Sequence, residues 1–211
     1  MLPLSEFLAV WAILAVNILS PGPNVLNTMT TAMGSGRAAG LASALGVGLG
    51  IGIWCLGMTL GMAAVFRVFP QLRIMLTALG ICLLLWFALR YLRNAWAGWR
   101  GTGAVLKGRT GLSFGSSFLR SLSVNALNPK ALTTWVAILS LFPVGHAGWG
   151  DILLLWAGTA SLAFTIHAGY AVVFSTAAAQ RLFLRAAPAV NAGVGLFFIA
   201  FALKLLGGLL S

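Results

Sequence analysis

Acidic residues are almost absent from this sequence: Glu6 and Asp151 are the only two among its 211 residues. Charged residues of both signs make up 7% of the chain, whereas hydrophobic residues make up 60% and the mean hydropathy is +1.01. This composition excludes an ordinary soluble domain. We therefore expect an integral membrane protein.

Cysteine is also scarce, and its placement excludes two kinds of chemistry. Cys55 and Cys82 lie in apolar stretches without a CxxC pattern, so neither a metal site nor a redox motif is indicated. No catalytic triad or carboxylate pair is visible, and we expect no enzymatic activity and no cofactor. The first apolar run lacks a basic leader and an A-x-A cleavage pattern, so we expect it to be retained rather than cleaved as a signal peptide.

Basic residues dominate the charge: thirteen Lys and Arg give a formal net charge of +11. In a soluble domain this excess would suggest a nucleic-acid partner. Here the cations lie mostly between apolar segments and beside their ends, where they act as topology signals and bind anionic lipids at the cytoplasmic face. We therefore expect the lipid bilayer, and no nucleic acid, as a partner.

Long apolar runs predict the membrane spans. A bilayer core of about 30 Å requires roughly 20 apolar residues per helix. Six segments meet this requirement: 4–33, 38–66, 70–92, 113–142, 150–175 and 187–209. Prolines interrupt the first and the fourth of them. An arrangement of five spans with one re-entrant segment stays open.

The distribution of basic residues between the segments predicts the topology. The first, third and fifth connections with adjoining helix ends carry eight cations, namely Arg37, Arg90, Arg93, Arg100, Lys107, Arg109, Arg181 and Arg185. The second and fourth connections carry only Arg67 and Arg73. By the positive-inside rule, the odd connections are cytoplasmic and both termini lie outside.

The longest connection, 94–112, is basic and glycine-rich, and it divides the chain into two halves, 1–93 and 113–211. Each half contains three predicted spans, so the halves enter the membrane from opposite sides, as in an inverted repeat. The predicted fold is an all-α membrane protein of six transmembrane helices, formed by two inverted three-helix repeats. The first helix of each repeat is interrupted at proline.

These interruptions fall at matching places. Pro21 and Pro23 lie 17 and 19 residues after the start of the first span, and Pro129 lies 16 residues after the start of the fourth. A proline inside a helix removes one backbone donor and opens a turn, whose polar groups lipid cannot satisfy. Paired breaks of this kind are typical of a transporter's substrate site, although ordinary proline kinks are the alternative.

Polar side chains form a stripe beside each break. The first consists of Asn17, Ser20, Asn24, Thr28 and Thr31, and the second of Ser117, Ser121, Asn125 and Asn128. Their spacing of three and four residues places each set on one helical face. From these stripes we predict the substrate-binding residues Asn17, Asn24, Thr28, Asn125 and Asn128. The alternative is that the stripes bond helix to helix.

Lys130 lies near the middle of the fourth span, where a lysine costs about 2.5 to 3.5 kcal/mol to insert. Because both acids lie at span ends, a substrate carboxylate is a candidate counter-ion. The alternative is that Lys130 snorkels to an interface or bonds carbonyls freed at the break. His167, in the fifth span, is a candidate proton relay or else a packing residue.

Glycines recur along one face of the second span, together with one serine. The set consists of Gly40, Ser43, Gly46, Gly50, Gly57 and Gly61. Small residues allow a neighbouring helix to approach closely, so we expect this face to be packed against another helix.

Two motifs carry a family resemblance. "LSPGPNVLNTMTTAMGSGRAAGLASALGVGLG" (19–50) followed by "NALNPKA" (125–131) resembles the LysE/RhtB family of amino-acid exporters. The resemblance implies secondary export of amino acids or related metabolites across the bacterial cytoplasmic membrane. It also implies functional roles for Pro21, Gly22, Pro23, Asn24, Asn128, Pro129 and Lys130.

One departure from the family bears on the substrate. Members often carry an Asp in the second span shortly after its glycines, whereas this chain reads "GIGIWCLGM" (50–58) without an ionisable group. A cationic substrate would lack a counter-charge there, so we expect export of a neutral amino acid, or of a small zwitterionic or acidic metabolite, by alternating access. A transmembrane thiol carrier and a non-transporting assembly subunit are the alternatives. The coupling ion and a homo-oligomeric state stay open.

Overall fold

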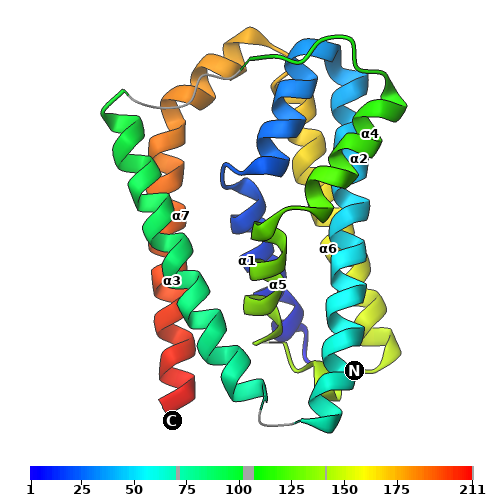
Figure 1. The fold of residues 1–211 in the computed structure, drawn as a ribbon, viewed down its shortest axis with the longest axis vertical. Coiled ribbons are helices and arrows are strands. Elements are labelled where there is room, and N and C mark those ends of the chain that lie inside the picture. The colour runs from blue at the N-terminus through cyan, green and yellow to red at the C-terminus, as the bar shows by residue number, and fades with distance from the viewer. Residues whose placement is uncertain (70–71, 102–106, 141, 211) are drawn as a thin grey trace.

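The computed structural model describes residues 1–69, 72–101, 107–140 and 142–210, and almost all of them are helical (Figure 1). The helices are α1 (Leu4–Leu19), α2 (Pro23–Val68), α3 (Leu72–Trp99), α4 (Phe114–Ala126), α5 (Pro129–Leu139), the short 3-10 helix η1 (Val144–His146), α6 (Trp149–Val173) and α7 (Ala177–Leu210). The described residues contain no strand, so the predicted all-α class is confirmed.

Four of these helices are long and apolar enough to cross a membrane. The qualifying stretches are Pro23–Met62, Thr77–Trp99, Trp149–Val173 and Arg185–Leu209. They lie in α2, α3, α6 and α7 and overlap the second, third, fifth and sixth predicted spans. The first and fourth predicted spans are instead pairs of shorter helices, since α1 is followed by the start of α2, and α4 by α5.

A sharp turn at Gly36 divides α2 into the segments 23–35 and 37–68. Gly36 has a φ of 85° and a ψ of 177°, which is not helical. This positive φ is accessible to glycine at no steric cost, whereas other residues rarely adopt it. The turn lies where the sequence predicts the first connection between spans.

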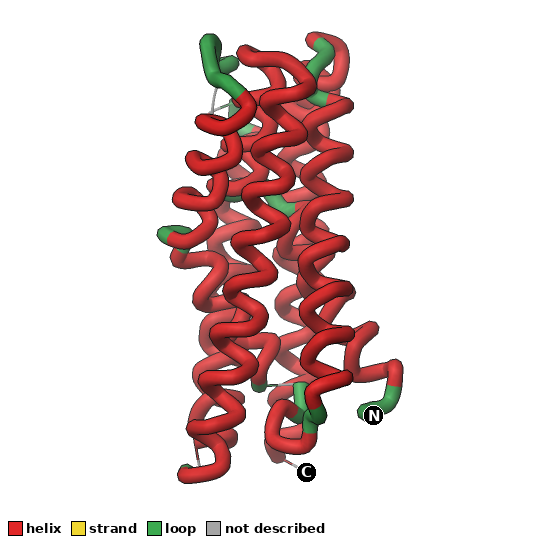
Figure 2. Tube along the Cα trace, turned by 90° about the vertical axis from the view of Figure 1, so that its right-hand side faces the viewer, coloured by secondary structure: helices red, strands yellow, loops and turns green. Residues whose placement is uncertain are grey.

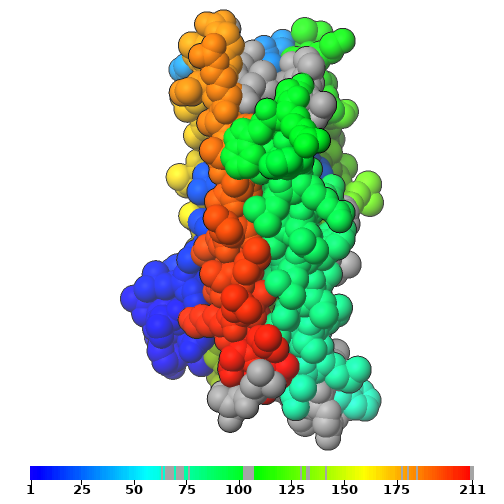
Figure 3. Space-filling model, turned by 90° about the vertical axis from the view of Figure 1, so that its left-hand side faces the viewer, coloured from blue at the N-terminus to red at the C-terminus, as the bar shows by residue number. Residues whose placement is uncertain are grey.

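Both termini lie at one end of the molecule, and the connection after α3 lies at the opposite end (Figures 1 and 2). α2 packs along α6, and α3 packs along α7. The α3–α7 pair forms one face of the molecule (Figure 3). This pair exposes large apolar side chains such as Leu85, Leu89, Leu196 and Leu203, as expected for a surface that contacts lipid.

Two apolar clusters enclose the short helices α1 and α5. The larger joins α1, α2, α5 and α6, and includes the buried Trp135 and an edge-to-face contact between Phe7 and Phe142, whose ring centroids are 5.5 Å apart. The second joins α3 and α7 and includes Ala137 of α5. Packing on both sides therefore buries most of the described side chains of α5 and the inner face of α1, including Asn17, Ile18 and Ser20 at the break.

The glycine face of α2 is only partly packed. A Cβ at Gly40 would collide with α6, and a Cβ at Gly46 or Gly50 would collide with α4, so the prediction of close packing is correct there. A Cβ at Gly57 or Gly61 would meet no described atom within 4 Å. For these two glycines the prediction of a packed helix is wrong, because the short α4 ends before it reaches their level.

Candidate functional site

The first helix break lies between α1 and α2. α1 ends at Leu19, and Ser20 is extended, with φ −78° and ψ 139°. Pro21 and Gly22 are not helical, and α2 begins at Pro23. The backbone carbonyls of the last turn of α1 therefore lack the helical donors that would otherwise follow them.

Side chains from two other helices bind the carbonyls freed at this break. The Lys130 ammonium, on α5, donates to the Asn17 carbonyl at 2.8 Å and to the Ser20 carbonyl at 3.4 Å. The Tyr170 hydroxyl, on α6, donates to the Leu19 carbonyl at 2.9 Å. Tertiary contacts thus satisfy polar groups that lipid could not satisfy.

The second break lies between α4 and α5 and has the chemistry of a helix start. Asn128 is the N-cap of α5, and its Oδ1 accepts a hydrogen bond from the Lys130 backbone N–H at 3.0 Å. Pro129 occupies the first turn, where its missing N–H costs nothing. The motif Asn-Pro-Lys is therefore also a capping motif that begins a half-helix inside the protein.

Lys130 joins the two breaks. Its ammonium also donates to the Ser20 hydroxyl at 2.7 Å and lies 5.4 Å from the centroid of the Tyr91 ring. The Tyr91 hydroxyl lies 2.7 Å from the same Ser20 hydroxyl. A Cβ at Gly22 would lie 3.1 Å from the ammonium nitrogen, so glycine leaves the space that the lysine uses. In this conformation Lys130 bonds carbonyls freed at the break, as one of the two interpretations of the sequence predicts.

A polar cavity lies between the breaks, and we call it the central cavity. Its polar lining consists of Asn17, Asn24, Asn125, Asn128, Lys130, Thr134 and His167. The Asn17 amide nitrogen donates to the Thr134 hydroxyl at 2.8 Å, across the space between α1 and α5. Six predicted site residues and the predicted proton relay, His167, therefore line this cavity; the six are Asn17, Gly22, Asn24, Asn125, Asn128 and Lys130.

Several buried polar atoms of the central cavity have no hydrogen-bond partner in the described part of the chain. They are Asn24 Oδ1, both side-chain polar atoms of Asn125, and His167 Nε2. His167 Nδ1 lies 2.9 Å from the Ala163 carbonyl, so only its Nε2 is left for another partner. A buried unpartnered group costs about 1–3 kcal/mol. These atoms therefore leave hydrogen-bond donors and acceptors available to water or to a polar solute.

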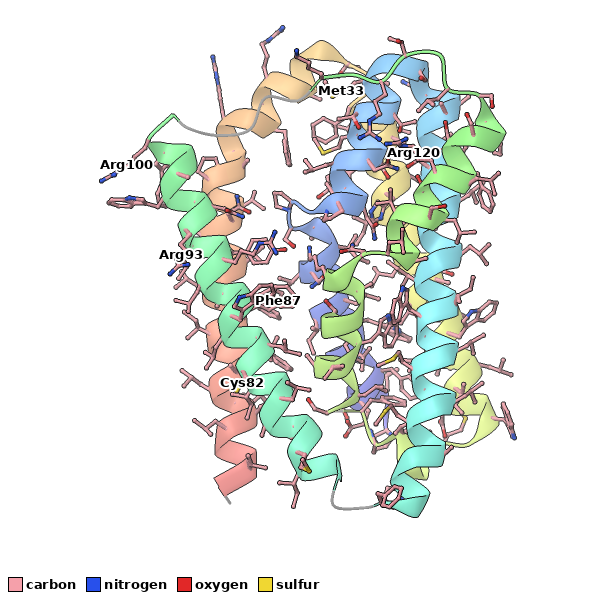
Figure 4. All side chains as sticks on the ribbon, in the orientation of Figure 1. Met33, Cys82, Phe87, Arg93, Arg100 and Arg120 are labelled. Carbon is pink, nitrogen blue, oxygen red and sulfur yellow. The ribbon has the colours of Figure 1, made fainter. Side chains whose placement is uncertain are left out.

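A second cavity lies beside α3, and we call it the α3 cavity. Its lining consists of Pro21, Gly22, Pro23, Trp86, Phe87, Arg90, Tyr91, Asn94, Asn128 and Lys130. Figure 4 shows Phe87 pointing from α3 toward the centre of the molecule. Gly22, Asn128 and Lys130 line both cavities and therefore form the boundary between them.

Thr28 lies further along α2, where it is fully buried and its hydroxyl lies 2.9 Å from that of Ser43. Ser43 in turn lies 2.5 Å from the Ser121 hydroxyl on α4. The contacts of Thr28 therefore agree with the alternative interpretation of the polar stripe, in which its side chains bond one helix to another. The side chain of Pro129 lies outside the described part of the structure.

A polar cluster surrounds Asn27, which no sequence motif singled out. Arg109 Nη1 and Arg120 Nε donate to the Asn27 Oδ1 at 3.0 and 3.1 Å, and the Asn27 amide nitrogen donates to Ser121 at 2.7 Å. Figure 4 shows Arg120 on α4 directed toward α2. Partial burial and the charge of Arg120 lower the pKa of Arg109. Through Arg109, this cluster links the C-terminal end of the 94–112 connection to α2.

Other lining residues were also missed. Thr134 lies four residues after Lys130, so its position on the same helical face was a readable signal. Tyr91 and Arg90 lie on α3, which has no break; Arg90 counts in the sequence only as a topology signal, and no local pattern marks either residue as part of a cavity lining. The two cysteines are far from both breaks in sequence: Cys55 is fully buried in α2, and Cys82 is exposed on α3.

The fold and the site together define a multi-pass helical membrane protein with a polar cavity between two helix breaks. The family profile of the LysE type translocators matches residues 15–208. The chain belongs to this family, which confirms the resemblance seen in its motifs. It is therefore a membrane translocator rather than an enzyme.

Individual relatives agree with this assignment. An uncharacterized membrane protein of Pseudomonas aeruginosa is 30% identical over 197 residues, which cover 92% of this chain and 91% of the relative. The threonine efflux protein of Escherichia coli K12 is 26% identical over 204 residues, covering 95% and 97%. That of Salmonella typhi is 26% identical over 205 residues, with the same coverage. No solved structure matches the chain.

Proposed function

We propose that this protein exports a neutral amino acid across the bacterial cytoplasmic membrane by alternating access, and that the amino acid binds in the central cavity. The observation that carries the proposal is the set of buried, unpartnered polar atoms on Asn24, Asn125 and His167, which face a cavity next to the Lys130 ammonium. An amino acid has a carboxylate, which accepts hydrogen bonds from cationic and N–H groups. It also has an ammonium, which donates hydrogen bonds to amide oxygens.

Two helix starts favour an anionic group at the breaks. The segment 23–35 of α2 begins at Pro23, and α5 begins at Pro129. A helix N-terminus stabilises a nearby anion by about 0.3 to 2 kcal/mol. Half-helix N-termini beside a substrate carboxylate are a recurring device in secondary transporters. We therefore assign the carboxylate to the side of the central cavity that holds Lys130.

We further propose that the two halves, 1–93 and 113–211, form inverted repeats joined by the cytoplasmic connection 94–112. In this scheme the broken pair α1 and 23–35 corresponds to α4 and α5, 37–68 corresponds to α6, and α3 corresponds to α7. The contacts α2–α6 and α3–α7 then pair equivalent helices. The position of both termini at one end supports this scheme (Figure 1). The basic connections would lie inside and the termini outside.

The proposal of a neutral substrate rests on the charges at the site. Lys130 is a cation in the lining of both cavities, and neither lining includes an acid. A cationic side chain on the substrate would therefore meet like charge without a counter-ion, which is costly in a low-dielectric site. The names of the threonine efflux relatives agree with this substrate class.

The test is export from cells that lack their own amino-acid exporters and are loaded with dipeptides. Efflux of threonine, serine, lysine and glutamate is measured with and without this protein. We expect faster efflux of threonine or serine and unchanged efflux of lysine. Faster efflux of lysine alone would refute a neutral substrate, and unchanged efflux of all four would refute the proposal.

A further inference from the structure

We propose that the α3 cavity is an entry subsite for the carboxylate of the exported solute, and that Arg90 binds this carboxylate before it passes to Lys130. The inference rests on the proposed function and deepens it, since it assigns a second binding step and a residue to that step. The ligand class is a carboxylate-bearing solute without net positive charge.

The first observation is the arrangement of charges. Arg90 and Lys130 line the same cavity. Glu6 and Asp151, the only acids in the sequence, lie in the first turns of α1 and α6 and do not line it. Two cations without an acid in one cavity attract an anion from the adjoining aqueous phase.

The second observation is the state of the Arg90 side chain. Arg90 is exposed, and its guanidinium carbon lies 5.6 Å from the centroid of the exposed Trp86 ring. A cation–π contact of this kind holds a guanidinium over the ring face and leaves N–H groups available to an acceptor. The planar guanidinium matches a carboxylate, with which it forms two parallel hydrogen bonds.

The third observation is the continuity of the two cavities. Gly22, Asn128 and Lys130 line both of them, so a solute in the α3 cavity already contacts the boundary of the central cavity. Lys130 donates to the Ser20 hydroxyl and to two carbonyls of the break. A carboxylate arriving from Arg90 would replace the Ser20 contacts and move the solute toward the unpartnered atoms of Asn125 and His167.

Binding is tested by thiol protection, a readout that does not require transport. Asn94 lines the α3 cavity one helical turn from Arg90, so Asn94→Cys, combined with Cys82→Ala, reports on occupancy. The rate of labelling by an anionic methanethiosulfonate is measured in membranes, with L-threonine or L-threonine amide as the probe. We expect L-threonine to slow labelling about tenfold and the amide, which lacks the carboxylate, to have no effect.

Arg93 supplies a matched control. It is an exposed arginine one turn further along α3, and Figure 4 shows it directed away from the centre of the molecule. We expect Arg90→Gln to abolish protection by L-threonine, Arg90→Lys to retain part of it, and Arg93→Gln to retain all of it. In transport assays Arg90→Gln should raise KM about tenfold and leave the maximal rate within twofold.

The outcomes separate this inference from the proposed function. If L-threonine is exported but protects equally in the Arg90→Gln and Arg93→Gln backgrounds, the entry subsite is wrong and the export function stands. If protection depends on Arg90 but no solute is exported, the subsite stands and the export function is wrong. Absence of protection by L-threonine in all backgrounds also overturns the subsite.

Discussion

Replacement of Lys130 by methionine is expected to abolish most transport while leaving the amount of protein in the membrane unchanged. The substitution keeps the length of the side chain and removes its charge. A hydrogen bond to a charged group contributes about 1.5–3 kcal/mol, which corresponds to roughly 10- to 150-fold in binding. We therefore expect efflux at subsaturating solute to fall by about one to two orders of magnitude.

The structure indicates that folding should tolerate this change. Without Lys130, the Asn17 carbonyl still accepts from the Ser20 hydroxyl at 2.5 Å, whereas the Ser20 carbonyl loses the Lys130 ammonium as its donor. One unpartnered carbonyl costs about 1–3 kcal/mol. Removing a mid-depth lysine recovers about 2.5 to 3.5 kcal/mol of insertion free energy. Because these two effects are similar in size and opposite in sign, we expect little net change in stability.

The assay is efflux of radiolabelled threonine from cells, normalised to the protein in the membrane by immunoblotting. Lys204→Met is the matched control, because Lys204 is exposed near the end of α7 and does not line either cavity. Lys130→Arg should retain partial transport, since a planar guanidinium replaces a compact ammonium. Threonine should also be transported faster than its amide.

A normal rate of threonine efflux in Lys130→Met, at a normal protein level, would refute this reasoning. It would show that the lysine serves only to bond the carbonyls of the break. Equal loss of transport in Lys204→Met would instead show that the assay responds to any lost charge.

Three further predictions follow from the fold. Reporter fusions should place the 94–112 connection in the cytoplasm and both termini outside; a cytoplasmic C-terminus would contradict the inverted repeats. Replacing Pro21 and Pro23 together by alanine should restore helical hydrogen bonds, so insertion should be normal and threonine efflux should fall at least tenfold. Unchanged efflux would show that the break is an ordinary helix kink without a role in transport. Asn27→Ala should lower stability by about 2–3 kcal/mol, because two arginines lose a shared acceptor; the check is thermal unfolding in detergent, with Asn191→Ala as a control that must remain closer to wild type.

The local sequence was sufficient for features that depend on one segment at a time. Apolar length predicts where α3, α6 and the second part of α2 lie, because the bilayer imposes a length of about 20 residues on any spanning helix. Proline chemistry predicts the breaks at residues 20–22 and 127–128, since a residue without an N–H cannot continue a helical hydrogen-bond ladder. The mid-depth position of Lys130 also follows from counting residues.

Only the tertiary structure decided which groups face one another. Helical periodicity assigns Thr28 and Asn24 to one stripe, yet Thr28 bonds Ser43 while Asn24 faces the central cavity. The two residues lie four positions apart, so the outcome depends on where α4 packs against α2, which no single segment encodes. In the same way, nothing in α3 itself marks Tyr91 or Arg90. They line the α3 cavity because α3 packs beside the α1–α2 break, where the Lys130 ammonium binds. That proximity arises from packing between helices that are distant in sequence.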